Sequence, residues 1–195
     1  MRAIGTDTFQ DPFNWNDSRG NLGGIRRHVL VASYVYDLPF RARGLARHAV
    51  DGWQVAGVLQ ALSGAPFSPA FTTQVQGSVG GRPDAVTGVP LYPPNRSIAR
   101  WFNPAAFVVP PDFTYGNAGY NQLWGPEQFN WDASLVKGFK LSERAVLTLR
   151  LEAFSAFNNP QFGNPNATIT NPAVVGTISS AGGNRTVQIG AKLQM

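Results

Sequence analysis

The last eleven residues of the chain alternate between two kinds of position. One parity holds Arg185, Val187, Ile189, Ala191, Leu193 and Met195, and the other holds Thr186, Gln188, Gly190, Lys192 and Gln194. Side chains along a β-strand point to opposite faces in turn, so a strand here has one apolar and one polar face. The length also fits the ~9–11 residues of a tilted membrane strand. We therefore expect residues 185–195 to form a strand that separates an apolar from a polar environment.

Two further alternating segments lie upstream, joined by a short polar connection at about 139–143. In the first, Trp131, Ala133 and Leu135 alternate with Asn130, Asp132 and Ser134. In the second, Leu147, Leu149, Leu151 and Ala153 alternate with Thr148, Arg150 and Glu152. A helix over 145–157 would spread the three polar side chains over about 200° and leave no apolar face. The two segments therefore predict a β-hairpin.

The faces of this hairpin can be checked for consistency, because directly opposed residues of an antiparallel pair share a face. A register with Asp132 opposite Arg150 brings polar residues together on one face and apolar residues together on the other. Its remaining pairs are Ser134–Thr148, Asn130–Glu152, Trp131–Leu151, Ala133–Leu149 and Leu135–Leu147. We take this register as the expectation.

Two earlier strands are expected at about 25–38 and 52–62. In the second, Trp53, Val55, Leu59 and Ala61 alternate with Gln54 and Gln60. The first has two competing apolar sets, and we favour the one that contains Tyr34 and Tyr36 as the outward face. With the three C-terminal strands, this predicts an all-β chain of about five antiparallel up-and-down strands.

The connections between these strands alternate in length. Residues 39–51 and 139–143 are short links at one end, whereas about 63–128 and 157–184 are long links at the other. The long links are rich in turn signals such as Asn-Pro and Pro-Pro. Short turns on one side and long loops on the other are typical of an outer-membrane barrel, so we expect the long links to be extracellular loops and the location to be the cell outer membrane.

The positions of charges support a membrane strand rather than a soluble one. On the apolar parity of the three C-terminal strands the only charges are Lys137 and Arg185, both near strand ends, where the ~2–4 kcal/mol cost of a lipid-facing cation falls away. We expect the lumen-facing residues to be Asn130, Asp132, Ser134, Thr148, Arg150, Glu152, Gln188 and Lys192. We expect the lipid-facing residues to be Trp131, Ala133, Leu135, Leu147, Leu149, Leu151, Val187, Ile189 and Leu193.

Composition excludes several functional classes. The chain has no cysteine and two histidines, His28 and His48, with no HxxxH, GxSxG or carboxylate cluster beside them. We therefore expect no catalytic residues, no metal site and no cofactor, and we do not expect an enzyme. The net charge of +5 comes without a basic helical stripe or a nucleic-acid motif, so no nucleic-acid partner is expected.

Two segments of the chain resemble a known family. The N-terminal one carries Tyr34-Val35-Tyr36-Asp37-Leu38-Pro39-Phe40, Gly52-Trp53-Gln54-Val55 and Ser63-Gly64-Ala65-Pro66-Phe67. The C-terminal one carries Arg100-Trp101-Phe102-Asn103-Pro104-Ala105-Ala106-Phe107, Gly116-Asn117-Ala118-Gly119, Asn130-Trp131-Asp132-Ala133-Ser134-Leu135 and Glu152-Ala153-Phe154-Ser155-Ala156-Phe157-Asn158-Asn159-Pro160-Gln161-Phe162-Gly163-Asn164-Pro165. Together they resemble the C-terminal barrel of TonB-dependent receptors of the Oar-like type, which often follows a carboxypeptidase regulatory-like domain.

The resemblance implies about five strands of a barrel of about 22 strands, with a plug and the remaining strands upstream. It also implies uptake of an unidentified bulky solute, energised through the TonB complex, with outer-membrane lipid as the surrounding partner. Five strands alone would leave open edges in hydrocarbon, so the chain is expected to be a barrel fragment. Met195 departs from the aromatic residue that usually ends these receptors. No signal peptide is recognisable at residues 1–7, so an export signal is expected elsewhere.

Several alternatives stay open from sequence alone. Asp132, Arg150 and Glu152 could line a solute path or form a structural polar ladder. The loop aromatics, chiefly Trp101, Phe107 and Trp124, could stack on sugars or peptides, or could pack the loop. The alternative to a transport barrel is a soluble β-sandwich that binds carbohydrate at its surface.

Overall fold

A computed structural model describes residues 10–11, 13–72 and 81–195. The chain divides into two compact units, which we describe separately. The sheet unit comprises Val29–Leu62, Gln128–Gln161 and Gly182–Met195, and the loop unit comprises the described parts of Met1–His28, Ser63–Glu127 and Phe162–Ala181.

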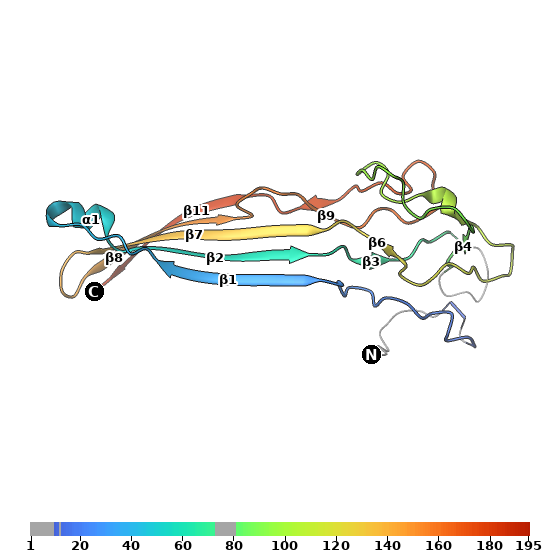
Figure 1. The fold of residues 1–195 in the computed structure, drawn as a ribbon, viewed down its shortest axis with the longest axis horizontal. Helices are drawn as coiled ribbons and strands as arrows, with labels where there is room; N and C mark the ends of the chain where they lie inside the picture. Colours follow the sequence, from blue (N-terminus) through green and yellow to red (C-terminus); the bar gives the residue numbers. More distant parts are fainter. Residues whose placement is uncertain (1–9, 12, 73–80) are drawn as a thin grey trace. The chain divides into compact units, whose positions relative to one another are not determined.

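The sheet unit is built from five long strands (Figure 1). They are β1 (Val29–Asp37), β2 (Trp53–Leu62), β7 (Gln128–Lys140), β8 (Val146–Phe154) and β11 (Thr186–Gln194). Each pairs antiparallel with the next long strand along the chain, in the order β1-β2-β7-β8-β11. This up-and-down order and the positions of all five strands confirm the predicted fold class. The same order rules out the β-sandwich alternative, because the five long strands form one sheet instead of two packed sheets.

The two short connections lie at the end of the sheet where the C-terminus lies (Figure 1). The first holds the single-turn helices η1 (Gly44–Ala46) and α1 (Arg47–Val50). The second is residues 141–145, where the amides of Leu141 and Ser142 both donate to the Ala145 carbonyl. No helix among the described residues has the length and apolar character to span a membrane.

The β7–β8 register differs from the expected one. Ser134 lies opposite Glu152, and Leu135 opposite Leu151, so every residue of β7 has its partner four positions further along β8 than expected. The predicted pairing of Asp132 with Arg150 is therefore wrong, since Arg150 lies opposite Val136. Strand β7 continues to Lys140, so the turn lies at 141–145 instead of the expected 139–143. The displacement is even, so the two faces keep the composition that alternation predicted.

The loop unit has a small core of its own. Its buried apolar residues are Phe67, Phe102, Ala106, Phe107, Ala118 and Leu123. Phe102 makes edge-to-face contacts with Phe67 and Phe107, at ring-centre distances of 5.9 and 6.0 Å. The long links were expected as loops, and these aromatic contacts explain why they are folded instead of extended.

Short elements organise this core. Strand β3 (Pro66–Phe67) pairs with β6 (Leu123–Trp124), and β4 (Asp84–Ala85) pairs with β5 (Phe107–Val108). The 3-10 helix η2 (Pro104–Ala106) is capped by the Asn103 side chain, which accepts from the Ala105 amide. Strands β9 (Gln161–Phe162) and β10 (Ala181–Gly182) form a further pair.

Within the loop unit, the buried residue Arg82 contacts residues near the N-terminus of the chain. Arg82 is 5% exposed, and its guanidinium forms an ion pair with the Asp17 carboxylate. The Arg82 amide donates to the Gln10 side-chain oxygen at 2.9 Å. A buried cation needs such partners because an unpaired charge away from water is costly.

Candidate functional site

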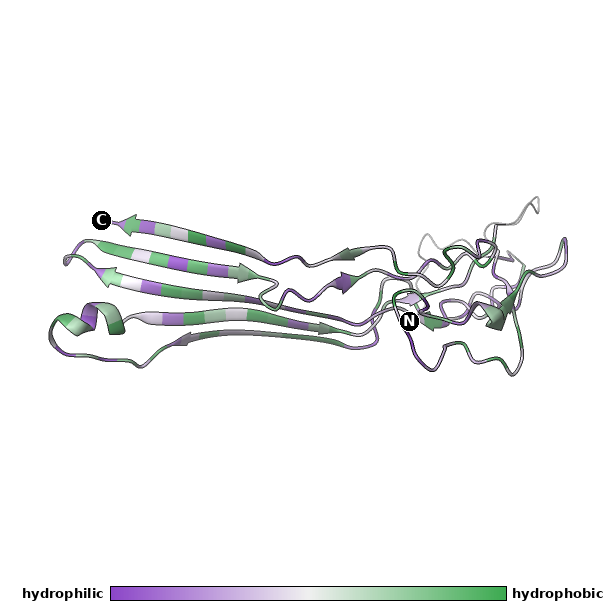
Figure 2. Ribbon diagram, turned by 90° about the horizontal axis from the view of Figure 1, so that it is seen from above, coloured by the Kyte–Doolittle hydropathy of each residue, from purple (hydrophilic) through white to green (hydrophobic). Residues whose placement is uncertain are grey.

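One face of the sheet collects polar side chains. The continuous registers place even-numbered residues of β7, β8 and β11 on the same side, since side chains alternate along each strand. Figure 2 shows the resulting hydrophilic and hydrophobic bands along the strands. The eight predicted lumen residues all lie on this polar face: Asn130, Asp132, Ser134, Thr148, Arg150, Glu152, Gln188 and Lys192. That they line a lumen remains a prediction.

The opposite face is apolar and continues across all five strands. It carries the nine predicted lipid-facing residues: Trp131, Ala133, Leu135, Leu147, Leu149, Leu151, Val187, Ile189 and Leu193. On β1 the set with Tyr34 and Tyr36 shares this face, because these residues oppose Gly57 and Val55 of β2. The favoured assignment of the tyrosine-bearing set thus agrees with the register. Contact of this face with lipid remains a prediction.

Aromatic side chains gather at the long-loop end of the apolar face. The Phe157 ring lies 4.9 Å from that of Trp131 and 6.1 Å from that of Phe129, measured between ring centres. The indole nitrogen of Trp131 donates to the Tyr34 hydroxyl at 3.1 Å. Rings with a polar tip are typical of a membrane–water interface.

The single charge on the strands of this apolar face is Lys137, near the short-turn end. It is 4% exposed and lies opposite Trp53, the first residue of β2. Its ammonium lies 5.3 Å from the Trp53 ring centre and 5.0 Å from that of Phe139, and it donates to the Asp51 carbonyl oxygen. The lysine thus directs its charge towards the turn, as snorkelling side chains do.

The charged residues of the polar face make mainly structural contacts. Arg150 donates to Glu152 at 3.4 Å, and Gln188 on β11 also donates to Glu152. Asp132 is separate from this group: its Oδ1 accepts from the Ser155 amide at 2.8 Å and from the Asn130 side chain at 3.0 Å. These bonds favour the polar-ladder interpretation for Arg150 and Glu152, and make Asp132 the cap of the turn after β8.

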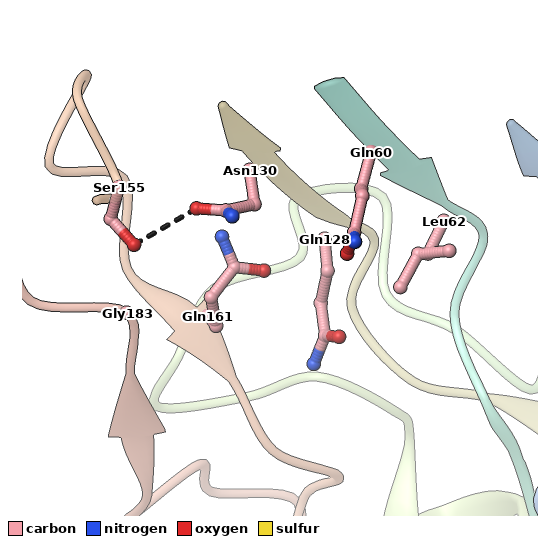
Figure 3. A pocket seen from close by; sticks show the side chains of 7 residues that line it. All are labelled: Gln60, Leu62, Gln128, Asn130, Ser155, Gln161 and Gly183. Atoms are coloured by element: carbon pink, nitrogen blue, oxygen red, sulfur yellow. Dashed lines mark hydrogen bonds between the residues drawn. The ribbon is translucent and has the colours of Figure 1, made fainter. Parts of the chain in front are cut away.

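A cavity of about 280 Å³ lies at the long-loop end of the polar face (Figure 3). Its lining residues are Gln60, Leu62, Gln128, Asn130, Ser155, Gln161 and Gly183. Sequence reasoning assigned Asn130 to the lumen and put Gln60 on a polar parity, but it missed the cavity. The sequence feature that could have indicated the cavity is the pair of glutamines at 128 and 161, which lie beside strand ends. The alternation of residues does not predict that the segment 155–161 lies against β7.

The three loop aromatics have different environments. Phe107 is 6% exposed and belongs to the core of the loop unit, so it packs the loop and has no free face for stacking. Trp101 donates from its indole nitrogen to the Trp124 carbonyl at 2.8 Å. The Arg27 guanidinium lies 4.4 Å from the Trp124 ring centre. Trp101 and Trp124 are partly exposed.

The titratable groups of the loop unit include one with a shifted pKa. Burial raises the pKa of the Tyr92 phenol above its ordinary value of 10.0, whereas the hydrogen bond from the Trp124 amide and the nearby Arg96 charge lower it by less. Of the two histidines, His28 precedes β1 instead of lying within it, and His48 is in α1. The described residues contain no group of three or more potential metal ligands.

Residues 2–188 match a family model described as an outer membrane beta barrel domain. Comparison with curated proteins and with solved structures found no match. The matched range contains β1, β2, β7 and β8 completely and the first residues of β11.

Proposed function

The chain belongs to the outer-membrane β-barrel domain family, and we therefore propose that it forms part of the wall of a TonB-dependent uptake receptor for a bulky solute. Its location is the cell outer membrane, where a barrel lies among membrane lipids. The proposed role is passage and selection of solute, without a catalytic step.

The observation that carries the proposal is the separation of the two sheet faces. A barrel in the outer membrane needs an apolar exterior and, where solute passes, a polar interior. The apolar face has one strand charge, Lys137, whose ammonium donates to the Asp51 carbonyl in the short turn before β2, whereas Asp132, Arg150 and Glu152 lie on the polar face. This arrangement supports the polar face as the lumen wall.

The TonB-dependent part of the proposal rests on the resemblance of residues 25–67 and 100–195 to Oar-like receptors. It requires further strands that pair with the edges of β1 and β11, because an unpaired strand edge in hydrocarbon leaves backbone groups without partners. It also requires a plug that contacts TonB in the periplasm. The long links would then form the extracellular entrance.

A pull-down from intact cells tests the proposal. An affinity tag inserted beside Gly182, in an exposed segment outside the long strands, would mark the chain without altering its C-terminal strand. After formaldehyde crosslinking and detergent extraction of the outer membrane, we expect to recover the plug and TonB with the tagged chain. Cells lacking TonB provide the control. Recovery of the chain from the outer membrane without TonB, under conditions that capture another TonB-dependent receptor, would contradict the proposal.

A further inference from the structure

We propose that the polar cavity at the long-loop end of the sheet binds a neutral, hydroxyl-rich group such as one ring of a carbohydrate. This inference rests on the proposed function for the cavity's place along a solute path, and it names the chemical class of the solute. The binding itself depends only on the residues of the sheet unit.

The sheet register builds two walls of the cavity. Gln60 on β2 lies directly opposite Asn130 on β7, and Leu62 lies opposite Gln128. Opposed residues share a face, so three amide side chains point to the same side of the sheet. Figure 3 shows these amides together with Gln161 around the opening.

The third wall comes from the turn after β8. Ser155 has a positive φ of 50°, which reverses the chain and directs its hydroxyl to Asn130, at 2.9 Å from Oδ1. Gln161 follows on β9, where its side-chain nitrogen donates to the Phe129 carbonyl. These bonds hold the Asn130 and Gln161 amides in place before any ligand arrives, which lowers the entropic cost of binding.

Hydrogen-bonding capacity remains in the cavity after these internal bonds are counted. The side-chain amide of Gln60 and the side-chain oxygen of Gln161 have no hydrogen-bond partner among the residues that the structure describes. Each amide group offers both donors and an acceptor. Sugar hydroxyls also donate and accept, so neighbouring hydroxyls match such a group.

The charge of the lining excludes other ligand classes. All seven lining residues are uncharged, so a charged ligand would lose hydration without an opposite charge in the lining to replace it. Leu62 is the single apolar side chain in the lining, so a large apolar group, or the side chains of an apolar peptide, would find little surface to bury.

The size of the cavity limits how much of a solute it can hold. Its volume of about 280 Å³ is at the small end of the ~300–1,000 Å³ of ligand sites. It suits a single sugar ring of a larger neutral solute. The cavity would thus act as one contact point on the path of a bulky carbohydrate.

The test is a titration of the isotope-labelled full chain in amine-oxide detergent micelles, because sugar-based detergents would compete. The neutral probes are maltose, cellobiose and lactose; gluconate, glucosamine and triglycine amide represent charged and peptide ligands. We expect at least one neutral disaccharide to shift the side-chain amide signals of Gln60, Asn130 and Gln161 saturably. The proposal would be overturned if none of the three disaccharides gave saturable shifts, or if a charged or peptide probe bound more tightly than the disaccharides.

Matched variants link binding to the cavity. Gln60→Leu should weaken disaccharide binding by about tenfold, the equivalent of ~1.4 kcal/mol, and Gln60→Glu provides a second variant if the leucine form fails to fold. Gln54→Leu is the control, because Gln54 lies on the same strand and face but outside the cavity. Equal affinity of Gln60→Leu and the unmodified chain would place the binding elsewhere and contradict the inference.

The two proposals fail in different experiments. Loss of sugar binding, with TonB still recovered in the pull-down, would remove the solute class and leave the uptake function in place. Saturable binding without TonB recovery would retain the cavity as a sugar site and overturn the uptake route.

Discussion

Trp131 on β7 donates a hydrogen bond from its indole nitrogen to the Tyr34 hydroxyl on β1, at 3.1 Å, across the intervening strand β2. Glycine at position 57 makes this contact possible. A β-carbon there would lie 2.6 Å from the Tyr34 hydroxyl oxygen and 2.7 Å from the Asp132 carbonyl oxygen. The Tyr34 ring therefore occupies the space above Gly57 and joins three strands at the aromatic end of the apolar face.

The first prediction is that Gly57→Ala destabilises the sheet. The added methyl group must displace the tyrosine or the neighbouring backbone, which we expect to cost about 2 kcal/mol. Urea unfolding in detergent micelles, followed by tryptophan fluorescence, measures the change. Gly190→Ala is the control, because a β-carbon at Gly190 on β11 meets nothing within 4 Å. Similar unfolding midpoints for the two variants would contradict the packing described for Tyr34.

The second prediction concerns Asp132 as the cap of the turn after β8. Asp132→Ala removes the acceptor of the Ser155 amide and should cost about 1–2 kcal/mol. Asp132→Asn keeps one side-chain oxygen in the same place and should cost much less. Hydrogen exchange of the Ser155 amide, measured alongside urea unfolding, should be faster in the alanine variant only. Equal exchange in both variants would show that the carboxylate does not cap this turn.

The third prediction concerns the buried charge of Lys137. Lys137→Glu would direct an anion at the Asp51 carbonyl and at two aromatic rings, and we expect a loss on the order of 3 kcal/mol from the contacts removed. Lys192→Glu, on the polar face of β11, serves as the control and should change stability little. The urea unfolding midpoint of each variant in micelles measures this change in stability. A smaller effect at position 137 than at position 192 would be inconsistent with the contacts described.

The fourth prediction is a pH dependence of the loop unit. Because burial raises the pKa of Tyr92, its neutral form is favoured in the folded state. The stability from this group is therefore present below pH 10.0, the unfolded pKa, and is lost as pH rises through the folded pKa. The difference between the tyrosinate absorbance titrations of the unmodified chain and Tyr92→Phe isolates this group. A midpoint at or below 10.0 would refute the expected shift.

The division of the sheet into two faces could be predicted from the sequence, because alternation with a period of two is a local property of a strand. Leu149 and Leu151 separate from Arg150 by geometry alone, whichever partner strand they meet. The strand ends of β7, β8 and β11 were placed within a few residues for the same reason. The up-and-down order followed from short links at 39–51 and 139–143 that alternate with long links at 63–128 and 157–184.

The register and the cavity could not be predicted in this way. Any even displacement of β8 along β7 matches polar with polar and apolar with apolar, so alternation cannot distinguish Glu152 from Thr148 as the partner of Ser134. The turn decides between them, through the bonds from Leu141 and Ser142 to Ala145. The cavity depends on positive φ values at Ser155 and Asn158, which redirect the chain in a segment without periodic structure.

The central claim is that the apolar face meets lipid and the polar face meets water. The chain has no cysteine, so Ile189→Cys and Gln188→Cys, adjacent on β11 but on opposite faces, can each carry a single environment-sensitive fluorophore in the outer membrane. We predict that nitroxide-labelled lipid quenches the label at position 189 and that aqueous iodide quenches the label at position 188. Equal quenching at the two positions by both reagents would contradict the account.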